Sequence, residues 1–68
     1  MEFRIQYFGP HDRFLYAEQI DAEELTVAVD RARDMLKEPS SAPVLDPSLL
    51  GYVILDRQGR LVARGYRR

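Results

Sequence analysis

Residues 21–38 read DAEELTVAVDRARDMLKE, and this stretch decides the fold because it is the one long amphipathic segment of the chain. Its apolar residues recur at spacings of three and four, which is the period of one face of a helix. These residues are Leu25, Ala28, Val29, Ala32, Met35 and Leu36. Asp21 followed by Glu24 resembles a capping box, and Pro39 has no amide hydrogen to continue a helix. The pattern therefore predicts a helix over about residues 21–38, capped by Asp21.

Strand-like stretches lie on both sides of this predicted helix. Residues 2–8 alternate in the period of a strand, and residues 14–19 return after a turn rich in Gly, Pro and Asp. Residues 50–56 and 60–66 flank a hairpin loop that ends in Gly59, a residue suited to the left-handed region. We expect a single α+β domain over residues 1–68. Its ββαββ order predicts a four-stranded antiparallel sheet, in strand order 2-1-3-4, with the helix packed on one face. Residues 39–48 are expected to be a crossover loop.

The pairing of each hairpin decides which side chains share a face of the sheet. Phe8 opposite Phe14 places Arg4 across from Glu18, which is a favourable cross-strand pair. In the second hairpin we expect Tyr52 to face Arg64 and Ile54 to face Val62. The expected helix side carries Phe3, Ile5, Tyr7, Leu15, Ala17, Val53, Leu55, Leu61 and Ala63. The expected opposite side carries Phe8, Phe14, Tyr16, Tyr52, Ile54, Val62, Arg64 and Tyr66.

This second set is the candidate interaction site. One helix covers one face of a sheet, so the other face of a half-solvated antiparallel sheet should be polar. Here it is apolar and aromatic, and large exposed apolar surfaces usually mark interaction sites. Tyrosine and arginine are also enriched among residues that dominate binding energy. The pattern predicts a small protein-interaction module that pairs with a second copy of itself or with another protein.

Composition supports this interpretation. The chain has 68 residues and no cysteine, so it has neither disulfides nor thiolate ligands to stabilise a small core. Oligomerisation is the remaining common means of stabilisation at this size. No apolar run is long enough to cross a membrane, and the N-terminus lacks the layout of a secretion signal, so we expect a cytoplasmic protein.

Two alternative functions stay open. All five basic residues after residue 38 are arginines, and with the tyrosines of the sheet they are suited to single-stranded nucleic acid. Against this stand a sequence pI of about 5.7 and the near absence of lysine. An enzyme or small-ligand binder is the remote alternative. His11 beside Asp12 lies in a predicted turn, and the glycines are isolated, so we assign no catalytic, cofactor-binding or metal-binding residue and expect no enzyme.

A resemblance rests on residues 2–8, residues 17–21 and the run VILDRQGRLVAR at residues 53–64. In this pattern the chain is similar to short bacterial proteins of hairpin–helix–hairpin type. The resemblance covers nearly the whole chain and implies the ββαββ arrangement. It implies no activity, cofactor or partner, because the function of those proteins is not known.

Overall fold

The computed structural model describes residues 1–37 and 49–67, and the structural statements that follow concern these residues. Strands β1 (Glu2–Phe8) and β2 (Phe14–Asp21) are joined by the short 3-10 turn η1 (Pro10–Asp12). Helix α1 (Leu25–Lys37) follows, and strands β3 (Gly51–Leu55) and β4 (Leu61–Tyr66) form the second hairpin. The four strands make one antiparallel sheet in the order β2-β1-β3-β4. The predicted α+β class and strand order are confirmed.

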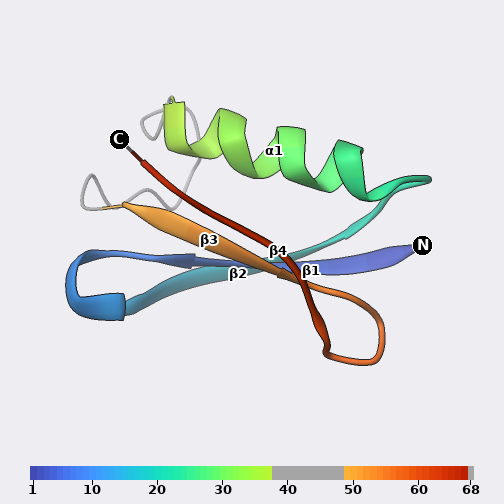
Figure 1. The fold of residues 1–68 in the computed structure, drawn as a ribbon, viewed down its shortest axis with the longest axis horizontal. Coiled ribbons are helices and arrows are strands. Elements are labelled where there is room, and N and C mark those ends of the chain that lie inside the picture. Colours follow the sequence, from blue (N-terminus) through green and yellow to red (C-terminus); the bar gives the residue numbers. More distant parts are fainter. Residues whose placement is uncertain (38–48, 68) are drawn as a thin grey trace.

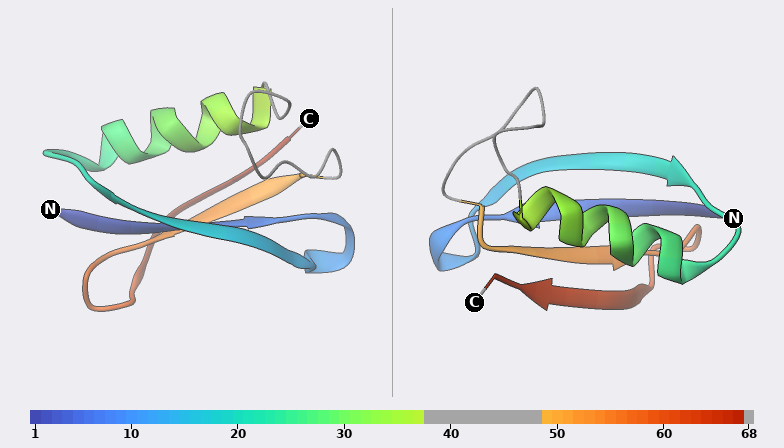
Figure 2. Two further views of the ribbon diagram at one scale, coloured as in Figure 1. Left: turned by 180° about the vertical axis from the view of Figure 1, so that it is seen from behind. Right: turned by 90° about the horizontal axis from the view of Figure 1, so that it is seen from above.

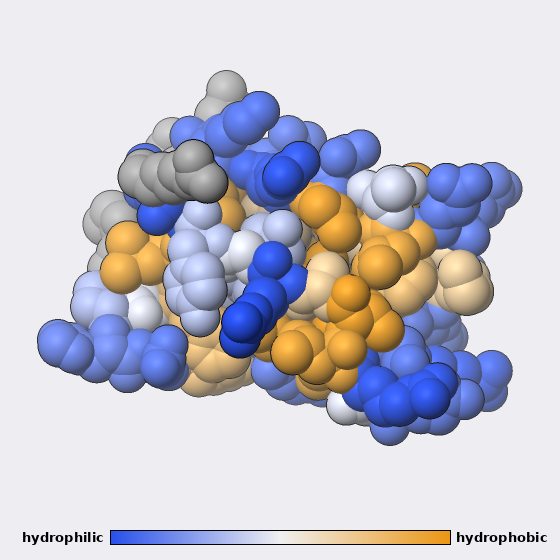
Figure 3. Space-filling view, viewed as in Figure 1, coloured by the Kyte–Doolittle hydropathy of each residue, from blue (hydrophilic) through white to orange (hydrophobic). Residues whose placement is uncertain are grey.

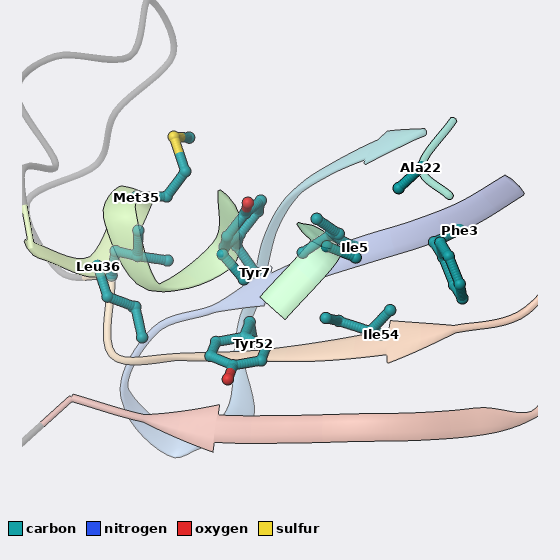
Figure 4. Close-up of a cluster of buried hydrophobic side chains, with 11 residues drawn as sticks. Phe3, Ile5, Tyr7, Ala22, Met35, Leu36, Tyr52 and Ile54 are labelled. Carbon is teal, nitrogen blue, oxygen red and sulfur yellow. The ribbon is translucent and has the colours of Figure 1, made fainter. Parts of the chain in front are cut away.

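Helix α1 lies across one face of the sheet, over the two central strands (Figures 1 and 2). Its buried residues are those of the predicted apolar stripe, namely Ala28, Ala32, Met35 and Leu36. Two alanines at the centre of this stripe let the helix approach the sheet closely. Figure 4 shows the large partners that fill the interface from the two central strands. They are Phe3, Ile5 and Tyr7 of β1 and Tyr52 and Ile54 of β3.

The helix begins at Leu25, so the predicted N-cap at Asp21 is wrong. Asp21 is instead the last residue of β2, where it pairs with Glu2. Its carboxylate accepts a hydrogen bond from the amino group of Met1 at 3.1 Å, and the Ala22 amide donates to the Met1 carbonyl at 2.8 Å. Strand pairing with the N-terminus therefore takes this residue away from the helix. The predicted helix end at residue 38 and the loop over residues 39–48 lie outside the described residues.

A β-bulge shifts the register of the first hairpin. The predicted pair of Phe8 and Phe14 is confirmed, but Tyr7 pairs with Tyr16, which leaves Leu15 without a partner. Every pair farther from the turn is displaced by one residue relative to the prediction, so Arg4 faces Gln19 and not Glu18. Because side chains alternate along a strand, a displacement of one residue turns each of them to the other face.

The turn of the second hairpin has the predicted form, with Gly59 in the left-handed region. Gly59 has a φ of 81° and donates its amide to the Asp56 carbonyl at 2.9 Å. The Asp56 carboxylate accepts amides from Arg60 and Gln58, each at 2.9 Å. These contacts, that of the Arg60 amide first, lower the pKa of Asp56 below its ordinary value.

The second hairpin also contains a β-bulge close to its turn. Leu55 pairs with Leu61 while Ile54 pairs with Ala63, so Val62 is the additional residue of this bulge. Tyr52 faces Gly65, and the expected pairs of Tyr52 with Arg64 and Ile54 with Val62 are wrong. The helix side keeps four residues predicted for it, namely Phe3, Ile5, Tyr7 and Ala63. Four others predicted for it lie on the opposite side by their pairing, namely Ala17, Val53, Leu55 and Leu61. Leu15, the unpaired residue, packs against the core.

Candidate interaction surface

The open face is the side of the sheet that faces away from α1. Its apolar residues come from all four strands and are Phe8, Phe14, Ala17, Val53, Leu55, Leu61, Val62 and Tyr66. Among these, Phe14, Leu61 and Tyr66 each expose more than half of their accessible surface. Figure 3 looks onto the β4 edge and shows hydrophobic residues gathered there beside hydrophilic ones. The sheet therefore presents apolar surface that no described element covers.

An aromatic row crosses one end of the open face. The rings of Phe8 and Phe14 meet edge to face, with centroids 6.0 Å apart and planes at 75°, a favourable geometry for an aromatic pair. Gly51 pairs with Tyr66, and a Cβ atom on Gly51 would lie 2.9 Å from Cδ1 of Tyr66. Glycine at this position therefore leaves room for the tyrosine ring to lie against the backbone of β3.

An aliphatic group occupies the other half of the open face. Val53 and Leu55 of β3 lie beside Leu61 and Val62 of β4. The bulge places both Leu61 and Val62 on this face, because Leu61 pairs with Leu55 and Val62 alternates with the helix-side residue Ala63. Consecutive leucine and valine side chains are thereby exposed at the sheet edge.

Charged residues divide the open face. Arg4 pairs with Leu55 and Arg64 pairs with Val53, so two exposed arginines stand among the aliphatic residues. Glu2 and Asp21 pair at one corner, where β1 begins and β2 ends. The long arginine stems can cover apolar neighbours while the guanidinium groups stay in water. The face is amphipathic, with arginines inside the apolar region and acids at its margin.

The predicted site residues divide between the two faces. Phe8, Phe14, Val62, Arg64 and Tyr66 lie on the open face, as their pairing requires. Tyr52 and Ile54 do not, since they lie under α1 with exposures of 6% and 0%. Tyr16 lies on the same covered side and stacks on Tyr7, with centroids 6.0 Å apart. Their expected placement on the open face is wrong, because each lies beyond a bulge.

Val53, Leu55 and Leu61 are open-face residues that the sequence prediction placed under the helix. A signal for them was present in β1, whose alternation fixes Ile5 on the helix side. Pairing Ile54 with Ile5 across the two central strands turns Val53 and Leu55 outward.

A partly exposed polar cluster ties the helix to the sheet on the covered side. The Glu18 carboxylate accepts from Arg31 Nε at 2.9 Å, from Arg31 Nη2 at 3.3 Å and from the Tyr7 hydroxyl at 3.3 Å. Burial raises the pKa of the Tyr7 phenol well above its ordinary value, and the Glu18 charge adds to this. Hydrogen bonding to Glu18 raises the pKa of Arg31 as well. The three groups satisfy one another, so this cluster is a structural link between β1, β2 and α1.

The remaining residues considered for chemistry lie apart from this cluster. His11 and Asp12 are exposed in η1 with φ values of 60° and 57°. Residues 1–37 and 49–67 contain no group of three or more His, Cys, Asp or Glu side chains placed to hold a metal ion. Within the same ranges, no helix is long and apolar enough to cross a membrane.

Comparison of the chain with protein-family models, with curated proteins and with solved structures yields no match.

Proposed function

We propose that this chain is a small, non-enzymatic protein-interaction module that pairs with a second copy of itself through the open face. The observation that carries the proposal is the exposure of apolar residues at both ends of the open face, namely Leu61 and Val62, at 55% and 37%, and Phe14 and Tyr66, at 52% and 66%. Apolar side chains exposed together on one face are costly in water, and a partner that covers them lowers that cost.

The dimensions of the molecule support a partner of similar size. Its principal extents are 29, 23 and 20 Å. Figure 1 looks down the shortest axis and shows the sheet edge-on, so the open face is bounded by the extents of 29 and 20 Å. An area of this order is comparable to the ~800 Å² that each partner buries in a standard interface. In a two-fold dimer the same patch meets itself, so one apolar face is covered in both copies at once.

The composition of the face also supports burial against protein. Phe8, Phe14 and Tyr66 supply aromatic contact area, and Arg4 and Arg64 supply hydrogen-bond donors within it. Aromatic residues and arginine are enriched in the buried parts of interfaces, while lysine is depleted. Both arginines are exposed at their positions on the sheet, so a partner can reach their guanidinium groups.

The test is the replacement of Val62 by Asp, followed by sedimentation at a series of concentrations. Val62→Asp places a charge within the aliphatic group of the open face, and we expect the dimer proposed for the original chain to dissociate. Val27→Asp is the matched control, because Val27 is 51% exposed on α1 and belongs to no sheet face. That variant should dimerise normally. A monomeric original chain at high micromolar concentration, or equal dissociation of both variants, would refute the proposal.

Single-stranded nucleic acid is the second candidate, because the aromatic row lies next to an arginine. Phe8, Phe14 and Tyr66 are placed to stack on bases, and Arg64, two residues before Tyr66 on the same face, is placed to meet phosphate. A titration with mixed oligonucleotides at low salt tests this, since the phosphate contribution is strongest there. Binding that fails to appear at low salt would remove this candidate and leave self-association untouched.

A further inference from the structure

A cleft on the helix side of the molecule brings together three cationic residues from distant parts of the sequence. It lies between the end of α1 and the end of β4, and its volume is about 390 Å³. Arg33, Leu36 and Lys37 line it from the helix, while Tyr66 and Arg67 line it from the strand. Figures 1 and 2 place these two segments at the same end of the molecule.

The described lining of this cleft carries positive charges and no carboxylate. Arg33 and Lys37 are four residues apart, so they lie on one side of the helix. Asp30 and Asp34 belong to the same helix but line no part of the cleft. Within the described part of the chain they form no ion pair with Arg33 or Lys37. Among the described residues, the positive charges therefore form no direct ion pair with Asp30 or Asp34 of their own helix.

Part of this arrangement has an ordinary explanation. Basic residues in the last turns of a helix complement the partial negative charge of its C-terminal end. That accounts for Arg33 and Lys37. It does not account for Arg67, which is not part of the helix and directly follows strand β4. The Arg67 amide donates to the Leu50 carbonyl, and this bond holds the residue beside the helix end. The third charge comes to the cleft through the fold of β4.

We propose that this cleft binds a small organic molecule that carries a phosphate group. A phosphate monoester has a charge of roughly −1.5 to −2 at neutral pH, which suits three cations better than a single carboxylate does. Arginine also matches phosphate with paired, charge-assisted hydrogen bonds. Leu36 adds apolar lining, and the volume falls within the ~300–1,000 Å³ of small-molecule sites. Tyr66 belongs to both surfaces, but Arg33, Lys37 and Arg67, whose charges carry this proposal, are not residues of the proposed self-association patch.

The experiment is a titration of the isotope-labelled full chain by NMR, at constant ionic strength in chloride. The probes are inorganic phosphate, phenyl phosphate and benzoate. We expect saturable shifts at the amides of Leu36, Lys37 and Arg67 with both phosphates. Phenyl phosphate should bind several-fold more tightly than inorganic phosphate, because its ring contacts the apolar lining, and benzoate should bind more weakly than phenyl phosphate. Equal affinity for the two phosphates would overturn the assignment of an organic ligand.

Two matched arginine variants decide whether the shifts report this cleft. Arg67→Gln should weaken the binding of phenyl phosphate about tenfold, as expected for the loss of one charge-assisted contact. Arg57→Gln removes the same charge from the second hairpin turn, at the opposite end of β3 and β4, and should change the affinity by less than about twofold. Arg33→Gln provides a second variant within the cleft. Equal weakening by Arg57→Gln and Arg67→Gln, or shifts that do not saturate, would overturn the proposal.

Discussion

The two faces of the sheet carry similar apolar residues but differ in what covers them. On the covered face, Ile54 and Tyr52 are 0% and 6% exposed under α1. On the open face, Leu61 and Val62 remain 55% and 37% exposed. Full burial of a side chain of this size contributes roughly 1.5–3 kcal/mol, so the two sets make unequal contributions to the fold. Apolar character alone therefore does not reveal which face of a sheet is the core.

The same contrast recurs in two glycine–tyrosine pairs on the second hairpin. Tyr52 lies across Gly65 on the covered face, and Tyr66 lies across Gly51 on the open face. Each glycine gives a ring access to the backbone of the neighbouring strand, a device that compensates for glycine in a sheet. The Tyr52 ring is enclosed by the core, whereas the Tyr66 ring is 66% exposed. One motif serves packing on one side and leaves a contact surface on the other.

Truncation of neighbouring residues on β3 should give the largest difference between the faces. Ile54→Ala leaves a cavity in the core under α1, so we expect a loss of about 2–5 kcal/mol in the free energy of unfolding. Leu55→Ala removes a side chain from the open face and should cost about 1 kcal/mol or less. Urea unfolding of both variants at low protein concentration measures the difference without a contribution from self-association.

Equal losses in these two variants would contradict the assignment of the faces. A further control is Val27→Ala on the outer surface of α1, where Val27 is 51% exposed. Alanine has the higher helix propensity, so this variant should be neutral or slightly more stable.

The strand pairings explain which parts of this fold were predictable from sequence. The elements follow from periodicity and turn residues, and these were sufficient for the strand order. Between the turn and the bulge of each hairpin the predicted pairing is also correct, as with Phe8 opposite Phe14. Beyond the bulge it failed, so Tyr16 and Ile54 were placed on the wrong face. A single additional residue reverses every later side chain, and no pattern in either strand marks it.

Two further misassignments have the same origin, which is competition from distant residues. Asp21 has the chemistry of a helix cap, yet pairing with Glu2 and the amino group of Met1 holds it in β2. Glu18 was expected to pair with Arg4 across the hairpin. The bulge turns it to the covered side, where Arg31 of the helix binds it at 2.9 Å. Local propensity predicts a set of partners, and tertiary pairing selects among them.

Replacement of Gly65 by alanine should give an intermediate effect on the covered face. An added Cβ would lie 2.6 Å from Cε1 of Tyr52, a distance that requires the ring to move. The core around Tyr52 resists that movement, so we expect a loss of about 1–2 kcal/mol in the free energy of unfolding. In a Tyr52→Leu background the same replacement should cost much less, because the obstructing ring atoms are gone. A double-mutant cycle measures this coupling, and additive losses would show that the ring is not the obstacle.

The change of unfolding free energy with pH should be the smallest of these effects, and it tests whether Tyr7 is buried on the covered face. Tyr7 is 1% exposed, and burial raises the pKa of its phenol in the folded state. The unfolded chain ionises this group near the ordinary pKa of about 10, so the stabilisation is complete below that value and is lost as the pH rises above it. We expect Tyr7 to account for a fall of about 1 kcal/mol in the free energy of unfolding between pH 9 and pH 11.

Tyr7→Phe should be less stable than the original chain at neutral pH, because it lacks the hydrogen bond to Glu18, but its stability should fall less steeply. Denaturant unfolding at several pH values measures both slopes, and equal slopes would mean that Tyr7 is accessible to water in the folded protein.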